Sequence, residues 1–101
     1  MHELDRLRDR IDALDTEIAK RVAQRFEVCR MIAGIKRDQS VPMMQTERVR
    51  AVHEHYQRLG AEQGTPVAFT TAFVDLLLAA TCTLEDQIID GSPGHQPAAR
   101  S

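Results

Sequence analysis

At 101 residues the chain is long enough for one domain at most, and 43% of its residues are apolar. It carries 13 basic and 15 acidic residues, so no basic excess exists to meet nucleic-acid phosphates or an anionic membrane surface. No apolar run approaches the length of a membrane span, and the first residues lack the basic and apolar segments of a signal peptide. We therefore expect a cytoplasmic protein that has neither nucleic acid nor a membrane as a partner.

The cysteines and histidines do not suggest a metal or redox centre. Cys29 and Cys82 lie far apart in the sequence and within helical patterns, so we expect both to be reduced and buried, with a disulfide as the alternative. His53 and His55 are two residues apart and would point to different faces of a helix. The sequence also has no phosphate-binding loop and no nucleophile triad. We expect no metal and no cofactor.

The first predicted helix, from Leu4 to Lys36, carries a heptad repeat of apolar residues. Such a repeat is typical of a long helix whose apolar stripe faces a partner helix. At ~1.5 Å per residue the helix would be roughly 48 Å long, more than a small domain requires, and it cannot bury its own stripe. We therefore expect an oligomer. The repeat consists of two interleaved series, Leu4, Ile11, Ile18 and Ile32, and Leu7, Leu14, Val28 and Ile35.

Arg21 and Arg25 occupy positions where this repeat would place an apolar residue. A cation at such a position costs desolvation unless an anion meets it. One interpretation is that the side chain lays its stem along the apolar stripe and keeps its charged end in water, and we favour this for Arg21. Arg25 has apolar positions on both sides along the helix. For this residue we favour the other interpretation, in which the guanidinium faces a pocket that holds an anion.

A loop is predicted over residues 38–44, because a proline within this segment imposes an extended or turn geometry. The apolar residues of the loop pack either into the core or as a lid over a ligand pocket, and they are Val41, Met43 and Met44. The second helix should begin near Thr46, a suitable N-cap, and end at Gly64. Its buried stripe would comprise Val49, Val52, Tyr56 and Leu59.

The third helix is predicted to begin at Thr65-Pro66, a cap residue followed by a proline at the first helical position. Its core face would comprise Phe69, Phe73, Leu76, Leu77, Ala80, Leu84 and Ile88. Residues 91–101 are poor in apolar side chains, so we expect a helical domain over 1–90 followed by a disordered tail. Because there is no strand pattern, the predicted fold class is all-α, with a three-helix protomer.

Basic residues beside the apolar surfaces form the candidate site. Guanidinium groups hold carboxylates through paired hydrogen bonds, so this set suits a small dicarboxylate. Arg8 and Arg25 are seventeen residues apart, or about 25 Å along a straight helix, too far for one such molecule. If both serve one site, Arg8 comes from a second subunit whose long helix runs antiparallel, and a homodimer with two shared sites follows. The full set is Arg8, Arg25, Lys36 and Arg48, together with Thr81 and Glu85, which lie one turn apart beside the apolar face of the third helix.

The spacing of these residues resembles that of the all-helical (AroQ-type) chorismate mutase family. The resemblance covers nearly the whole chain and depends on the motif Leu7-Arg8-x-x-Ile11-x-x-Leu14-Asp15, followed by Arg25, Lys36, Pro42 and Arg48. It implies an intertwined homodimer of three-helix protomers. It also implies a Claisen rearrangement of chorismate to prephenate that uses no cofactor and forms no covalent intermediate.

The resemblance implies that most of the set binds the substrate. Arg25 and the partner subunit's Arg8 would hold carboxylates, and Arg48 would match the family's arginine of the second helix. Thr81 stands where the family commonly has serine. Glu85 stands where the family has glutamine or glutamate, and it also belongs to the expected substrate contacts.

The expected catalytic residues are Lys36, Glu85 and Arg25. A pericyclic shift needs no nucleophile or base, but it needs the flexible substrate held in its reactive chair form. Negative charge develops on the ether oxygen as the C–O bond breaks, and Lys36, which the resemblance places beside that oxygen, would stabilise it. Glu85 can serve as a second hydrogen-bond donor only when its carboxyl is protonated.

Two positions depart from the family pattern. Gln45 and Val49 stand where bacterial members have acidic residues near the 4-hydroxyl of the substrate. Val49 accepts no hydrogen bond, so a hydroxyl there would lose a partner. Together with the segments Val41-Pro42-Met43-Met44-Gln45 and Cys82-x-x-Glu85-Asp86, these positions most resemble the branch that acts on 4-amino-4-deoxychorismate, on the way to aminophenylalanine-type building blocks of secondary metabolites.

Three other functions stay open. A chorismate mutase of aromatic amino acid biosynthesis would use the same residues, and a lyase of this fold would eliminate pyruvate from isochorismate with the same arginines. A dimerisation module without enzymatic activity would leave the arginines as solvated edges of the heptad repeat. Arg25 argues against this module, because a coiled coil would place Leu or Ile at its position.

Overall fold

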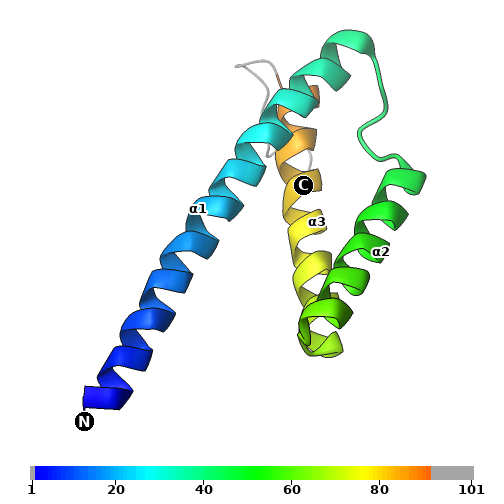
Figure 1. Ribbon diagram of the computed structural model, residues 1–101. Coiled ribbons are helices and arrows are strands. Elements are labelled where there is room, and N and C mark those ends of the chain that lie inside the picture. Colours follow the sequence, from blue (N-terminus) through cyan, green and yellow to red (C-terminus); the bar gives the residue numbers. More distant parts are fainter. Residues whose placement is uncertain (1, 92–101) are drawn as a thin grey trace.

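The computed structural model describes residues 2–91, and its regular structure there is helical throughout (Figure 1). The predicted all-α class is therefore confirmed. Of the predicted tail 91–101, only Gly91 belongs to the described residues, so the expected disorder lies outside them. The elements are α1 (His2–Gln39), α2 (Thr46–Gln63) and α3 (Val67–Asp90).

Helix α1 extends slightly beyond both predicted ends, Leu4 and Lys36, and it stops in a Schellman motif. Ser40 adopts the left-handed conformation with φ 57° and donates its backbone N–H to the Arg37 carbonyl (3.4 Å). Val41 donates its N–H to the Lys36 carbonyl at 2.8 Å. These bonds satisfy carbonyls at the helix end and turn the chain into the loop over residues 40–45, one or two residues later than predicted.

Helix α2 ends as predicted, with Gly64 at φ 74° and its backbone N–H directed to the Ala61 and Gly60 carbonyls. The predicted caps are each wrong by one residue. Gln45 caps α2 in place of Thr46, and Pro66 precedes α3 as its cap, without side-chain hydrogen bonds in either case. The first turns of α2 and α3 are therefore not stabilised by a side-chain cap.

Helix α3 packs against both α1 and α2, which make little contact with one another. The buried positions of α3 follow one line along the helix, which differs from the predicted core face. Leu77 is buried as predicted, but Phe69 is 59% exposed and Leu76 is 71% exposed. On α2, Val52 is buried and Leu59 is exposed. The buried line of α3 consists of Thr70, Val74, Leu77, Thr81 and Glu85.

Close approach of α2 to α3 depends on Gly60. A Cβ added at Gly60 would lie 2.7 Å from Oγ1 of Thr70 on α3, closer than real Cβ atoms come, and 3.3 Å from its Cγ2, which is also tight. Gly60 and Thr70 are both buried. The glycine thus permits the close approach of α2 and α3, two helices that both contribute to the cavity described below.

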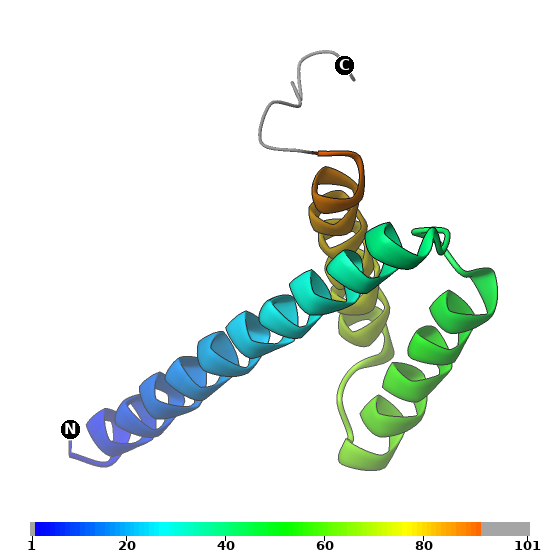
Figure 2. The same cartoon turned by 90° about the horizontal axis from the view of Figure 1, so that it is seen from above.

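The N-terminal half of α1 extends away from the other two helices as a free arm (Figure 2). The described chain measures 55 × 28 × 24 Å, and its radius of gyration is 17.5 Å. A compact chain of this length would have a radius of gyration of about 13 Å. Every residue from 2 to 21 is exposed. The apolar residues of the arm are exposed with them, and they are Leu4, Leu7, Ile11, Leu14 and Ile18.

By length and composition alone, α3 could cross a membrane, since its mean hydropathy reaches 1.8. The expectation that no segment approaches the length of a membrane span is therefore wrong for this helix. The interior helix of a soluble domain passes the same test. Asp75 and Glu85 lie within α3, and the buried Glu85 pairs with a lysine of α1. Only 22% of the most apolar 18-residue stretch of α3 is buried within the chain, so most of this stretch is not covered by α1 or α2.

Replacing Gly60 with Ala should destabilise the protein by about 1–3 kcal/mol, because the added methyl forces Thr70 or the helix axis to move. Gly34→Ala is the matched control. It lies inside α1 with only the end of the Arg37 side chain within 4 Å of its added Cβ, so it should stabilise by up to about 1 kcal/mol. Thermal unfolding of both variants measures the difference. Equal effects of the two substitutions would contradict the role given to Gly60.

Candidate active site

A cavity of about 340 Å³ lies where the C-terminal part of α1, the loop, the start of α2 and the C-terminal part of α3 meet. Polar and charged side chains stand among apolar ones on its walls. The polar lining residues are Arg25, Lys36, Gln45, Arg48, Thr81 and Glu85. The others are Val28, Cys29, Ile32, Met43, Met44, Val49, Val52, Leu78 and Cys82. A mostly apolar wall with a few convergent polar groups is typical of a small-molecule site.

Lys36 and Glu85 form an ion pair across the cavity wall, between α1 and α3. Lys36 Nζ donates to Glu85 Oε1 at 2.8 Å, and the two side chains are only 14% and 7% exposed. Lys36 Nζ also donates to the backbone carbonyl of Met43 at 2.6 Å. The ammonium has three hydrogens, so one remains for a ligand. The pair therefore ties the loop to both α1 and α3.

Arg25 is half-buried and enters the cavity from α1. Its Nη1 donates to Thr81 Oγ1 on α3 at 2.9 Å and lies 3.7 Å from Cys29 Sγ, one turn further along α1. The interpretation that Arg25 faces a pocket is therefore confirmed. Arg21, by contrast, is exposed and pairs with Glu17 at 2.9 Å, as expected for a solvated arginine.

Helix α2 contributes the third cation of the cavity, Arg48. No carboxylate pairs with the Arg48 side chain among residues 2–91, so its charge is free to meet a ligand. Gln45 and Val49 also line this wall, one turn apart at the start of α2. At the start of α2, the lining residues therefore offer a ligand one guanidinium and one amide, and no carboxylate.

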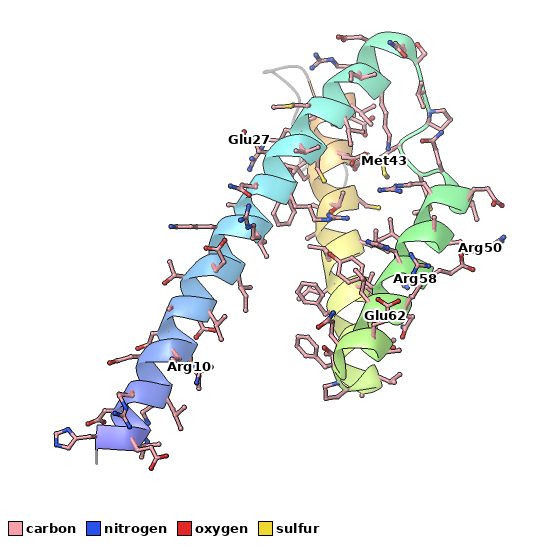
Figure 3. The ribbon with its side chains drawn as sticks, in the orientation of Figure 1. Arg10, Glu27, Met43, Arg50, Arg58 and Glu62 are labelled. Atoms are coloured by element: carbon pink, nitrogen blue, oxygen red, sulfur yellow. The ribbon has the colours of Figure 1, made fainter. Side chains whose placement is uncertain are left out.

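The loop forms part of the cavity wall. Met43 and Met44 belong to the lining, and Figure 3 shows Met43 between the loop and α3. Of the two alternatives for the apolar residues of the loop, core or ligand pocket, these two residues lie at the pocket, while Val41 lies outside the lining and is half-buried. Cys29 is buried as predicted, Cys82 is half-buried, and both are free thiols.

Arg8 is the one predicted site residue that the cavity does not include. It is exposed on the free arm of α1, a region marked in Figure 3 by Arg10. The rise of a helix places it about 25 Å from Arg25 along α1. Arg8 therefore cannot bind the same small molecule as the cavity of its own chain. The separation of Arg8 and Arg25 in the sequence predicts the same limit.

Sequence reasoning missed two contacts that shape the site. Cys29 stands one turn after Arg25, a spacing that could have suggested their contact. The carbonyl of Met43, which accepts from Lys36, has no sequence signal, because every residue carries such a group. Among residues 2–91, no three His, Cys, Asp or Glu side chains group together to hold a metal ion.

The cavity can bind a small anion with more than one carboxylate. Three cationic side chains, Arg25, Lys36 and Arg48, face a single carboxylate among the described lining residues. Charge-assisted hydrogen bonds from such groups are stronger than neutral ones, and apolar walls keep water from competing with them. The arrangement can therefore fix the orientation of a dianion and supply a donor where negative charge develops.

Comparison with known proteins supports the same conclusion. The family model for chorismate mutase type II matches residues 7–86. A 4-amino-4-deoxychorismate mutase from Streptomyces pristinaespiralis is 38% identical over 100 residues, which cover 97% of this chain and 78% of that protein. Another 4-amino-4-deoxychorismate mutase, from Streptomyces venezuelae, is 34% identical over 88 residues, covering 87% of this chain and 85% of that protein. No solved structure matches the chain significantly. The matched region contains every residue that lines the cavity, and the chain belongs to the chorismate mutase type II family.

Proposed function

We propose that this protein is a mutase that converts 4-amino-4-deoxychorismate into 4-amino-4-deoxyprephenate by a Claisen [3,3] rearrangement. The observation that carries the proposal is the cavity in which Arg25, Lys36 and Arg48 converge on mostly apolar walls. The two relatives described above bear the name of this activity. We infer that the reaction takes place in the cytoplasm and serves the biosynthesis of a secondary metabolite such as an antibiotic.

The reaction moves electrons within one molecule. One C–O bond breaks, one C–C bond forms, and no group leaves, so the protein has to supply shape and charge only. Arg25 and Arg48 would hold the carboxylates and keep the flexible side chain over the ring. Lys36 would direct its remaining hydrogen to the ether oxygen, which gains negative charge as the C–O bond breaks.

Glu85 would share this task with Lys36. In the chain its Oε1 accepts from Lys36, which leaves the other carboxyl oxygen for the substrate. A protonated carboxyl can donate to the ether oxygen, whereas an ionised one would repel the developing charge.

The 4-amino group is assigned to the wall formed by Gln45 and Val49. Neither side chain carries a charge, and the amide oxygen of Gln45 can accept a hydrogen bond from an amino group. This wall lacks the carboxylates that bacterial chorismate mutases place near a 4-hydroxyl. The names of the relatives and these two residues together support the amino substrate over chorismate itself.

We propose that the working enzyme is a homodimer with shared sites. The free arm of α1 exposes Leu4, Leu7, Ile11, Leu14 and Ile18, a stripe too apolar to remain in water. Antiparallel pairing of two α1 helices would cover the stripe and bring the partner subunit's Arg8 to Arg25. Sedimentation at micromolar concentration should then give about twice the 11.4 kDa of one chain.

Product analysis separates the proposed reaction from its alternatives. The protein should be incubated separately with 4-amino-4-deoxychorismate, chorismate and isochorismate. Rearranged product from the amino substrate supports the proposal. Prephenate formed in preference would indicate a chorismate mutase, and pyruvate from isochorismate would indicate a lyase. Absence of all three reactions would leave a dimerisation module.

For substrate choice, we expect kcat/KM to be higher for 4-amino-4-deoxychorismate than for chorismate. Val49→Glu should shift the ratio toward chorismate by about tenfold or more, since it adds an acceptor for the 4-hydroxyl. Val67→Glu, at a valine that is 69% exposed, is the matched control and should leave the ratio unchanged. A wild-type preference for chorismate of about tenfold would show that the substrate assignment is wrong.

For the shared site, Arg8→Ala and Arg25→Ala should each lose at least ~2–3 kcal/mol of transition-state binding. Mixing the two inactive proteins should restore up to about a quarter of wild-type activity, because each mixed dimer keeps one complete site. Arg10→Ala, on the same exposed arm, should keep full activity by itself. No recovery after verified subunit exchange would mean that both arginines act within one chain.

For the role of Glu85, we expect Glu85→Gln to keep much of the activity, because its amide can donate to the ether oxygen while its oxygen still accepts from Lys36. Glu27→Gln, on the exposed surface of α1, is the matched control and should leave kcat unchanged. Loss of most of the activity in a folded Glu85→Gln would contradict the donor role given to this position.

A further inference from the structure

Helix α3 carries an exposed apolar patch near its N-terminal end, outside the cavity. The spacing of a helix places its four residues on one face, and they are Phe69, Ala72, Phe73 and Leu76. Phe69 and Leu76 are largely exposed, and Phe73 is half-buried. The rings of Phe69 and Phe73 are stacked with centroids 5.7 Å apart, and Phe73 meets Tyr56 of α2 edge to face at 5.8 Å. Contiguous apolar side chains of this kind mark an interaction surface, whereas single exposed ones do not.

A second groove, of about 240 Å³, lies between this patch and the base of the free arm of α1. Ile18 and Val22 of α1 line one side of the groove, and Phe73 and Leu77 of α3 line the other. Glu17 of α1 also belongs to the lining. Phe73 therefore lies across the groove from the segment of α1 where the arm leaves the other two helices, and the α3 patch stands beside that segment.

The proposed dimer places a twofold axis beside the same groove. An antiparallel pair of α1 helices that brings the partner subunit's Arg8 to Arg25 is centred halfway between positions 8 and 25. The axis then passes beside residues 16 and 17, at the edge of the groove. The heptad repeat requires nearly the same centre, because the apolar layers of antiparallel helices then stack Leu14 of one helix against Ile18 of the other.

We infer that the α3 patch is a second contact of the dimer, in which it meets the same patch of the other subunit. The inference rests on the homodimer proposed above. A surface beside a twofold axis lies beside its own copy, so it must be complementary to itself. The α3 patch meets this requirement because none of its four residues carries a charge. Ala72 leaves space between Phe69 and Leu76 into which side chains of the other copy can pack.

The second contact sets the angle at which the partner's arm crosses the cavity. Within one chain, the arm of α1 diverges from α2 and α3 (Figure 2), and every residue from 2 to 21 is exposed. Two helices that touch along a single line can still turn about that line, whereas a contact between the α3 helices removes this freedom. The patch therefore acts on the site only through the position of the partner subunit's Arg8, for which small displacements matter.

Substitutions at Leu76 test whether the patch meets its own copy. Leu76→Asp and Leu76→Lys each bring two like charges together beside the axis, so each should weaken dimerisation by roughly 100-fold or more in sedimentation equilibrium. Mixing the two variants should restore the dimer, because opposite charges then face one another. Val67→Asp is the matched control, since Val67 is 69% exposed against 71% for Leu76 and lies on the opposite face of α3. It should dimerise as wild type does.

The outcomes of this experiment are distinct. A Leu76→Asp protein that dimerises as tightly as wild type would overturn the inference, because the patch would lie outside the interface. Weak dimerisation of both Leu76 variants without recovery in their mixture would overturn it too, because the patch would meet a different surface of the partner. A monomeric wild type would overturn the proposed dimer and the inference together. Recovery in the mixture, with no turnover of 4-amino-4-deoxychorismate by wild type, would refute the proposed reaction alone.

Fluorescence tests the patch without adding a charge. The chain contains no tryptophan, so Leu76→Trp and Val67→Trp each introduce a single reporter. The emission of Leu76→Trp should be blue-shifted in the dimer, where the other copy covers the indole, and should move to the red when dilution separates the subunits. Val67→Trp should emit as a solvated indole at every concentration. The same solvated emission from both dimeric variants would overturn the inference.

Discussion

The buried ion pair between Lys36 and Glu85 is the interaction on which the rest of the site depends. Both side chains are largely removed from water, and the same ammonium also holds the loop through the Met43 carbonyl. Removing one partner of a buried pair leaves an uncompensated charge, which typically costs about 3–5 kcal/mol. The pair therefore fixes how α1, the loop and α3 meet. That junction creates the cavity and places cations on apolar walls, where they act most strongly on a dianion.

The two halves of helix α1 have different surroundings. Its C-terminal part supplies Arg25 and Lys36 to the cavity, while its N-terminal part exposes an apolar stripe and Arg8 on a free arm. A chain of this size cannot bury both halves of such a helix by itself. In the proposed dimer, the surface that needs a partner is also the surface that brings the missing arginine. Assembly and completion of the site would then be one event.

The heptad repeat and the turn residues made the fold predictable. They located all three helices, and Gly64 ended α2 where expected. The buried line of α3 was not predicted, because apolar periodicity does not distinguish residues that are buried within the chain from exposed apolar residues such as Phe69 and Leu76. In the site, charge among apolar residues identified Arg25 and Lys36. The contact of the Met43 carbonyl with Lys36 required coordinates, because backbone groups have no sequence pattern.

In the proposed enzyme, the cavity holds a dicarboxylate through Arg25. Thermal unfolding of wild type and Arg25→Ala, each with and without prephenate, tests it most directly. A ligand at 100 times its Kd stabilises the folded state by about 2.7 kcal/mol, so wild type should unfold at a clearly higher temperature with the ligand. Arg25→Ala should show little or no increase. An equal increase in both proteins, or none in wild type, would contradict the account.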